Sequence, residues 1–174
     1  MIPVRLKKSE LSECRQFASL RWQMARLSHV KNDRRDQGRT DNDIDELGIK
    51  AEKAVAKLFG LDFKASAMGI DSGDDMYIDV GNKEVSIQVK ASFYPQGKLL
   101  FKSLDSFLSE LAILVTADTT QDDVMLVMGW VSQKHFREKC VHEDLGHGKC
   151  YTLDQTHLLG MSKLWEHIVT ARFK

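Results

Sequence analysis

A stretch near the middle of the chain alternates apolar and polar residues on both sides of a Gly-Asn pair. This pattern predicts two half-buried strands, and Gly81-Asn82 suits a tight two-residue turn with glycine first. The sequence therefore predicts an antiparallel hairpin with one apolar face. That face carries Met76, Ile78, Val80, Val85, Ile87 and Val89.

The register of this hairpin predicts which polar side chains share its other face. A two-residue turn places Val80 opposite Lys83, and it then places Asp75 opposite Gln88. Because side chains alternate along a strand, Lys90 lies on the same face as Gln88. We therefore expect carboxylates, an amide and a lysine to converge on one patch formed by Asp75, Tyr77, Asp79, Glu84, Gln88 and Lys90.

Helices and further strands are predicted around the hairpin. Helical spacing of apolar residues predicts one helix over residues 9–27 and a second over 44–59, capped by Asp43 or Asp45 and stopped by Gly60. Residues 61–67 are compatible with a short strand. The remaining predicted elements are strands over 111–116 and 124–131, a short helix over 133–139 and a closing helix over 156–169. This order predicts a mixed α/β layer.

Composition limits the class of protein. The 174 residues are 43% hydrophobic and 29% charged, which excludes collagen-like and fully disordered chains. An odd number of cysteines argues against a disulfide framework and for a reducing compartment. The apolar runs are too short to span a bilayer, and no secretory signal is visible. We therefore expect a cytoplasmic protein without membrane segments.

The net charge of zero conceals an uneven distribution. Residues 1–40 contain ten Lys and Arg against four Asp and Glu, a net charge of +6, and the remainder carries −6. The polar stretch 28–43 predicts a linker or an extended arm. A basic arm can engage a polyanion, although a solvated helix and linker explains the charge without a partner. We expect a helix and basic arm over 1–43 and a folded domain over 44–174.

Glu52 adds a further carboxylate to the candidate chemistry. It lies on the predicted second helix among apolar neighbours, so it is partly desolvated unless something pairs with it. Gly48, one turn earlier, would let this helix lie close to the sheet. Oxygen ligands around a hard cation, with a lysine beside them, suit metal-assisted phosphodiester hydrolysis. Lys90 would orient the attacking water or neutralise charge on the phosphate.

These motifs resemble the PD-(D/E)XK nuclease superfamily, which has the restriction-endonuclease-like fold. The match comprises the G-x-x-x-E helix at Gly48 to Glu52, the strand aspartate within residues 74–79 and the Q-x-K form at Gln88 to Lys90. The spacing from Asp75 to Gln88 resembles that of archaeal Holliday-junction resolvases, and Q-x-K is similar to Mrr-type restriction endonucleases. The motifs cover residues 44–92, and a looser likeness extends to about residue 132.

The resemblance implies a mixed sheet flanked by helices and a Mg²⁺- or Mn²⁺-dependent DNA nuclease, phage or bacterial, in the cytoplasm of its cell or host. It also implies DNA as substrate and a homodimer, because enzymes of this type often act as dimers. The Gly-Asn turn favours Asp75 as the strand aspartate, whereas a loose G-D-x-G-x-D match favours Asp79. The implied metal ligands are Glu52, Asp75 or Asp79, Gln88 and the carbonyl of Val89, with Lys90 assisting the attacking water.

Two other functional hypotheses remain open. Glutamine at the usual acidic position also suits a catalytically inactive nucleic-acid-binding or protein-interaction module on the same fold, and Glu52 could simply pair with Lys90. Separately, Cys140, His142, His147 and Cys150 could bind structural Zn²⁺ in an adaptor protein. The single residue between Cys140 and His142 is shorter than the usual ligand spacing, so we expect the cysteines to be buried rather than metal-bound.

Overall fold

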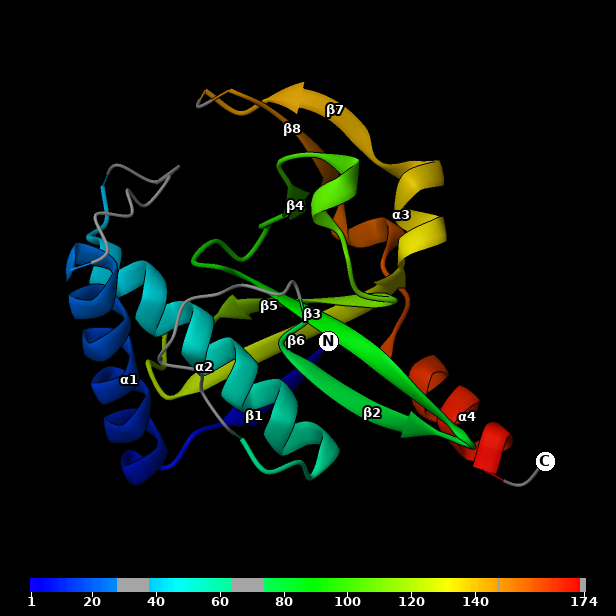
Figure 1. Ribbon diagram of the computed structural model, residues 1–174, viewed down its shortest axis with the longest axis horizontal. Helices are drawn as coiled ribbons and strands as arrows, with labels where there is room; N and C mark the ends of the chain where they lie inside the picture. Colours follow the sequence, from blue (N-terminus) through cyan, green and yellow to red (C-terminus); the bar gives the residue numbers. More distant parts are fainter. Residues whose placement is uncertain (28–37, 64–73, 147, 173–174) are drawn as a thin grey trace.

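A mixed central sheet organises the computed structural model, which describes residues 1–27, 38–63, 74–146 and 148–172. The strand order is β1-β6-β5-β3-β2 (Figure 1). Strands β3 and β5 run parallel, and the other neighbours are antiparallel. The strands are β1 (Ile2–Arg5), β2 (Met76–Val80), β3 (Lys83–Ser92), β5 (Leu111–Ala117) and β6 (Val124–Ser132).

Helices and a smaller sheet flank the central sheet. The smaller sheet is antiparallel in the order β4-β8-β7. Its strands are β4 (Leu99–Phe101), β7 (Val141–Asp144) and β8 (Lys149–Leu153), and the helices are α1 (Lys8–Leu27), α2 (Asp41–Phe59), α3 (Gln133–Lys139) and α4 (Met161–Arg172). The expected mixed sheet flanked by helices is therefore confirmed at the level of an α/β architecture.

The structure confirms the hairpin that the alternation predicted. Val80 pairs with Lys83 and Met76 pairs with Ile87. Gly81 begins the turn with a φ of 65°, the left-handed region that glycine adopts without steric cost. The expected strands over 111–116 and 124–131 correspond to β5 and β6, and α3 has the predicted bounds.

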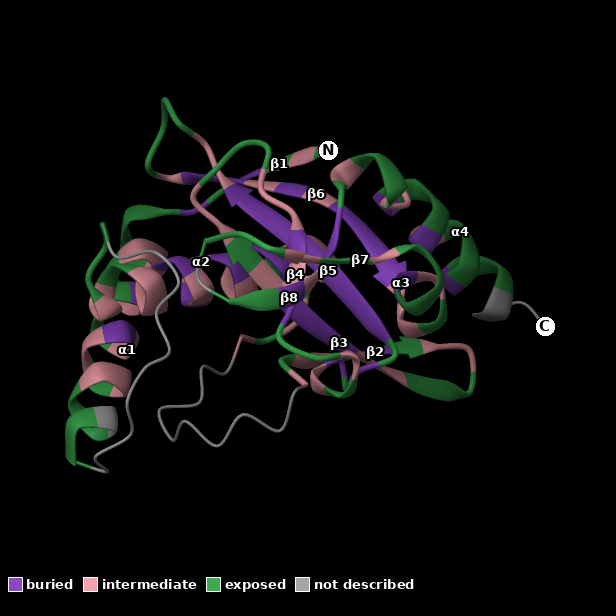
Figure 2. Ribbon diagram, turned by 90° about the horizontal axis from the view of Figure 1, so that it is seen from above, coloured by how far each residue is buried: buried purple, intermediate pink, exposed green. Residues whose placement is uncertain are grey.

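Two apolar clusters lie on opposite faces of the central sheet, and buried residues follow its strands (Figure 2). On one face, α2 and α4 pack against the apolar side of the hairpin, where Ile87 and Val89 are buried. On the other face, Ala112 and Leu114 of β5 contact the phenylalanine residues Phe101, Phe107 and Phe136. The side chains at alternate positions of β3 therefore enter two different environments.

Helix α2 begins three residues earlier than predicted, and its cap differs. Thr40 is the N-cap, in an extended conformation, and its side chain accepts a hydrogen bond from the Asp43 amide at 3.2 Å. The Asp43 carboxylate in turn accepts a hydrogen bond from the Thr40 amide at 2.9 Å, which completes a capping box. The expectation of Asp43 or Asp45 as the cap is wrong because both lie inside the helix. Gly60 ends the helix with a φ of 68°, as predicted.

The closing helix begins later than predicted, because Gln155–His157 form a separate 3₁₀ turn and Leu159 then pairs with the central sheet. The Trp130 and Leu159 backbones exchange two hydrogen bonds, at 2.9 and 2.8 Å. This pairing holds residue 159 extended, so α4 starts only after Gly160. Residues 61–63 form no strand, and 64–67 lie outside the described residues.

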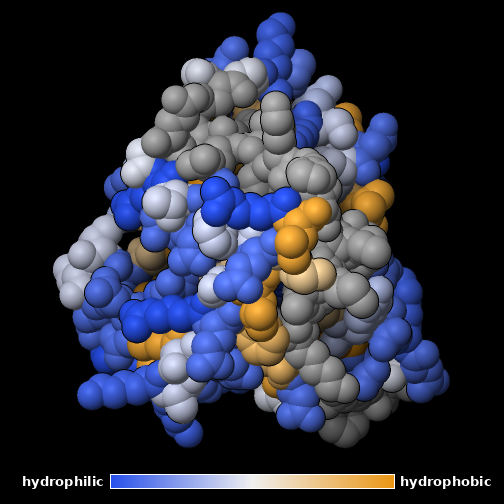
Figure 3. Space-filling model, turned by 60° about the vertical axis from the view of Figure 1, so that its left-hand side comes forward, coloured by the Kyte–Doolittle hydropathy of each residue, from blue (hydrophilic) through white to orange (hydrophobic). Residues whose placement is uncertain are grey.

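Residues 1–27 are joined to the rest of the fold. Strand β1, which the sequence did not predict, pairs with β6 at one edge of the central sheet, and α1 packs on α2 through Cys14, Ala18 and Ile49. Figure 3 shows apolar atoms among polar ones on the side that carries α1.

Arg34 and Arg35 of the expected arm lie outside the described residues, whereas Arg39 stacks on Phe93. Within the described chain, no helix is long and apolar enough to cross a membrane.

Candidate active site

Asp75 lies at the start of β2, and hydrogen bonds fix both its backbone and its side chain to β3. Its amide donates to the Ile87 carbonyl at 2.9 Å, and its carboxylate Oδ2 accepts from the Val89 amide at 2.6 Å. Because Met76 pairs with Ile87, the same register places Asp75 beside Gln88. The residue is exposed, so a solvent-accessible carboxylate lies next to the Q-x-K strand.

Gln88 places a carbonyl oxygen in an apolar environment. Its side chain is 3% exposed, and it shares a face of the sheet with Ala112, its partner on β5. Its Oε1 atom is buried without a hydrogen-bond partner among the described residues. An unsatisfied buried acceptor costs about 1–3 kcal/mol, so this oxygen is suited to a cationic ligand or a hydrogen-bond donor.

Lys90 lies on the same face two residues farther along β3. It is half-buried, and its Nζ atom lies 5.1 Å from the centre of the Phe101 ring of β4. A cation over an aromatic face is held by the electrostatic attraction of the ring. The smaller sheet therefore forms one wall beside the Q-x-K residues.

Asp79 is exposed and pairs with Glu84 rather than with Gln88. Asp79 lies four positions after Asp75, roughly 13 Å along a strand. The structure therefore places Asp75 at the end of the hairpin where β3 carries Gln88 and Lys90, and it places Asp79 toward the turn. The Val89 side chain points into the apolar cluster beneath α2, as expected from the alternation.

Glu52 lies on the side of α2 that meets α1. Both of its carboxylate oxygens accept from the Arg21 guanidinium at 3.4 Å, and its side chain is 13% exposed. Helix α2 packs on the face of the sheet opposite to Gln88. Gly48 is not needed for a close approach, because nothing among the described residues lies within 4 Å of the position of a Cβ atom there.

Arg21 also influences Asp45, one turn from Gly48 on α2. Burial raises the pKa of Asp45 above its usual value, the positive charge of Arg21 opposes that rise and the nearby Asp41 reinforces it. Arg21 is thus a cation that faces an acidic side of α2, as Arg15 is through its contact with Glu46 at 3.3 Å.

Sequence reasoning did not identify Asp74 and Ser109 as site residues. Asp74 Oδ1 accepts a hydrogen bond from Ser109 Oγ at 2.6 Å, and Oδ2 accepts one from the Tyr77 hydroxyl at 3.0 Å. The bond to Asp74 raises the pKa of Tyr77. The adjacent acidic pair Asp74-Asp75 was a visible signal, but a partner 35 residues away along the chain was not predictable from it.

The candidate zinc ligands lie in different surroundings. His142 pairs with Tyr151 and stacks on its ring, whereas Cys150 is buried and pairs with Glu143. Consecutive residues of a strand point to opposite faces, so His142 and Cys150 point apart. Cys140 ends α3, and His147 lies outside the described residues. Within the described ranges, no three His, Cys, Asp or Glu side chains are grouped to hold a metal.

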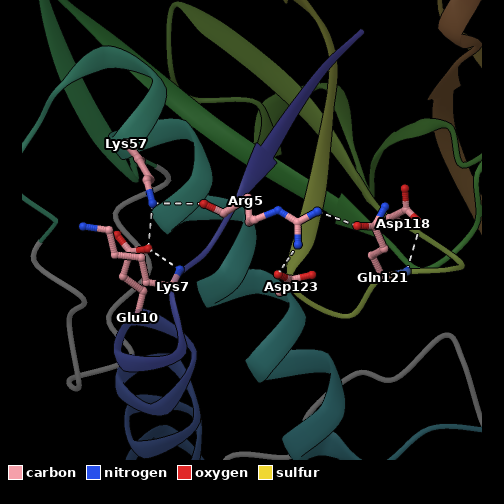
Figure 4. Close-up of polar contacts among 7 residues, drawn as sticks. All are labelled: Arg5, Lys7, Glu10, Lys57, Asp118, Gln121 and Asp123. Atoms are coloured by element: carbon pink, nitrogen blue, oxygen red, sulfur yellow. Dashed lines mark hydrogen bonds and ion pairs between the residues drawn. The ribbon is translucent and has the colours of Figure 1, made fainter.

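A basic cleft of about 600 Å³ lies away from these residues, between the end of β1, the start of α1, the end of α2 and the turn between β5 and β6. Two of its cations form ion pairs (Figure 4): Arg5 contacts Asp123 at 2.6 Å, and Lys57 contacts Glu10 at 2.7 Å. Lys57 also donates to the Arg5 carbonyl at 2.9 Å. These contacts join α1, α2 and the β5–β6 turn, so stabilisation of the fold accounts for the basic residues of the cleft.

Comparison with family models, curated proteins and solved structures finds no match to this chain.

Proposed function

We propose that the protein is a metal-dependent DNA nuclease that hydrolyses phosphodiester bonds at the site formed by Asp75, Gln88 and Lys90. The observation that carries the proposal is the Asp75 carboxylate bonded to the Val89 amide, next along β3 to Gln88, whose buried Oε1 has no partner among the described residues. Lys90 adds a cation on the same face of the sheet. Oxygen donors next to a lysine are the groups that phosphodiester hydrolysis with a hard cation requires.

The donor set fits Mg²⁺ or Mn²⁺, because both prefer oxygen ligands. Asp75 and Gln88 would hold the ion, together with the Val89 carbonyl. Glu52, the further ligand that the resemblance implied, lies on the helix that covers the opposite face of the sheet, contacts Arg21 and is not included in this set. A bound divalent ion would polarise the phosphate and lower the pKa of a bound water. Lys90 would stabilise negative charge that develops on the phosphate oxygens, and Phe101 would limit the directions available to its side chain.

Cleavage assays test this proposal directly. Purified protein is incubated with linear, nicked, single-stranded and branched DNA in Mg²⁺, in Mn²⁺ and in EDTA. We expect metal-dependent cleavage, and we expect Lys90→Ala to lower its rate by about 10²-fold or more, the usual effect of removing a group that stabilises transition-state charge.

Lys163→Ala is the control. Lys163 is exposed on α4, which packs on the face of the sheet opposite to Gln88, so this variant should retain the wild-type rate. Absence of any metal-dependent product, or equal loss in both lysine variants, would contradict the proposal.

One observation favours the second candidate function, a catalytically inactive nucleic-acid-binding module. Arg21 contacts both oxygens of Glu52, and Gln88 supplies no negative charge, so the group of Asp75, Gln88 and Lys90 carries one carboxylate rather than two. DNA binding without cleavage in either metal would support this alternative. Homodimerisation, which the resemblance implied, is checked by measuring the molar mass of the protein with and without DNA.

A further inference from the structure

Asp74 connects the start of β2 to a buried residue outside the hairpin. Its carboxylate accepts the Ser109 hydroxyl at 2.6 Å, and Ser109 is 0% exposed, two residues before β5. The opposite oxygen accepts the hydroxyl of Tyr77, which is itself exposed. Asp74 therefore makes one buried and one exposed hydrogen bond.

The segment that carries Ser109 is itself attached to β3. The Glu110 amide donates to Ser86 Oγ at 3.0 Å, and the Glu110 carboxylate contacts the Ser86 amide at 3.4 Å. Glu110 also pairs with Lys83. Ser109 is thus presented from a segment whose position relative to the hairpin is fixed by several polar contacts.

Two hydrogen bonds restrain Asp75, one made by its own side chain and one made by the preceding residue. Its carboxylate is bonded to the Val89 amide at 2.6 Å, and the residue before it is bonded to Ser109. If the Asp75 carboxylate and the Gln88 oxygen are to hold the same ion, the backbone of Asp75 has to be fixed. A displacement of about 1 Å greatly weakens binding and catalysis at a preorganised site.

We infer that Asp74 and Ser109 are positioning residues that hold the Asp75 carboxylate against β3, in register with Gln88. The inference deepens the proposed function and rests on it where metal binding is concerned. The Asp74–Ser109 bond acts through the backbone of Asp75, and neither residue needs to touch the ion.

The Val89 amide reports this role without any metal or substrate, because its hydrogen-bond acceptor is Asp75. Native-state hydrogen exchange is measured by NMR on the full chain for the wild type, Ser109→Ala, Asp74→Ala and Asp74→Asn. We expect Ser109→Ala and Asp74→Ala to accelerate exchange at Val89 about tenfold, the effect of losing a hydrogen bond to a charged group. Asp74→Asn retains an acceptor for Ser109 and should stay within about threefold of the wild type.

Two controls separate positioning from general destabilisation. The Val127 amide in buried β6, two strands away from β3, monitors the stability of the sheet and should be unchanged in every variant. Tyr77→Phe removes only the exposed bond to Asp74 and should leave Val89 unaffected. Val89 exchange that is unaltered in Ser109→Ala, or that rises in parallel with Val127, would overturn the inference.

Mn²⁺ binding, measured by electron paramagnetic resonance, provides the second readout. Ser109→Ala and Asp74→Ala should each raise the Kd for Mn²⁺ about tenfold, whereas Asp74→Asn should not. An equal rise in Asp74→Asn and Asp74→Ala would make Asp74 a direct ligand and overturn the positioning role. If the wild type neither binds Mn²⁺ nor cleaves DNA, the proposed function fails, while the Val89 measurement still decides whether Asp74 and Ser109 hold Asp75.

Discussion

Arg21 lies outside the predicted motif, yet its contacts decide the environment of Glu52, a residue within that motif. The G-x-x-x-E pattern identified Glu52, but its carboxylate contacts the Arg21 guanidinium through both oxygens. Asp45 lies within reach of the same positive charge, yet burial still raises its pKa. At the residue scale, this side of α2 therefore combines an ion pair with a carboxylate that is partly desolvated.

The raised pKa of Asp45 gives a pH-dependent prediction. In the unfolded chain Asp45 titrates near its usual value of 3.8, and in the native state it titrates at a higher pH. Below the pKa that Asp45 has in the unfolded chain, its protonated form contributes its full stabilisation of the native state. This stabilisation is lost as the pH rises through the higher pKa that Asp45 has in the native state. Asp45→Asn removes this loss, so the variant should have a higher Tm than the wild type at neutral pH.

The difference in Tm should shrink toward zero below a pH of about 3, where Asp45 is protonated in both states. Thermal denaturation followed by circular dichroism across this range measures it. Asp62→Asn, at an exposed position beyond α2, is the control and should show no such trend. A lower Tm for Asp45→Asn at neutral pH would mean that attraction to Arg21 outweighs burial.

At the scale of the element, the start of α2 depends on a cap that lies outside the apolar pattern. The apolar residues first recur at Ile44, but the helix begins at Asp41 because Thr40 and Asp43 satisfy each other's amides. The side-chain bond also explains why the pKa of Asp43 is lowered, since the Thr40 hydroxyl and amide both stabilise the carboxylate. The three added residues extend the helix toward Arg39 and Phe93, which stack on each other.

Thr40→Ala should destabilise the protein by about 1 kcal/mol, because the Asp43 amide loses its acceptor. For a chain of this length, that corresponds to a decrease of about 2–4 °C in Tm. Urea denaturation measures the free energy of unfolding. Thr40→Ser retains the hydroxyl and should restore most of it, so an equally destabilised serine variant would count against the capping box.

At the scale of the whole molecule, the two apolar clusters share the strands of one sheet. Consecutive residues of β5 point to opposite faces: Ile113 lies in the cluster beneath α2, and Leu114 lies in the cluster beneath the smaller sheet. Phe107 stacks on Phe101 with ring centres 4.5 Å apart, and Phe136 of α3 meets both rings edge-on. We therefore expect the smaller sheet and the central sheet to unfold in one cooperative transition.

Phe107→Ala should reduce the free energy of unfolding by about 3–5 kcal/mol, because it leaves a cavity in this aromatic group. The neighbouring Leu108 is 61% exposed, so Leu108→Ala should change stability by no more than about 0.5 kcal/mol. Urea denaturation followed by tryptophan fluorescence and by circular dichroism gives both values. Two separate transitions in either probe would contradict a single cooperative unit.

Local patterns predicted the parts of the fold whose partners are close in sequence. The hairpin register followed from alternation and the Gly-Asn turn, and the end of α2 followed from Gly60, whose φ of 68° suits glycine. The apolar surroundings of Val89 were also predicted, because a period of two assigns each residue to a face. The proximity of Asp75 and Gln88 follows from the same register.

The sequence by itself thus determined the hairpin, its two faces and its register from Val80 and Lys83 to Met76 and Ile87, because neighbouring residues and a turn are enough to set a register. Only the tertiary structure decided the contacts that join distant segments. Strand β1 pairs with β6, and residue 159 is held extended by its pairing with Trp130. Arg21 forms an ion pair with Glu52, and Ser109 donates a hydrogen bond to Asp74. Each of these depends on packing that brings together residues remote in sequence, and no local period encodes such a partner.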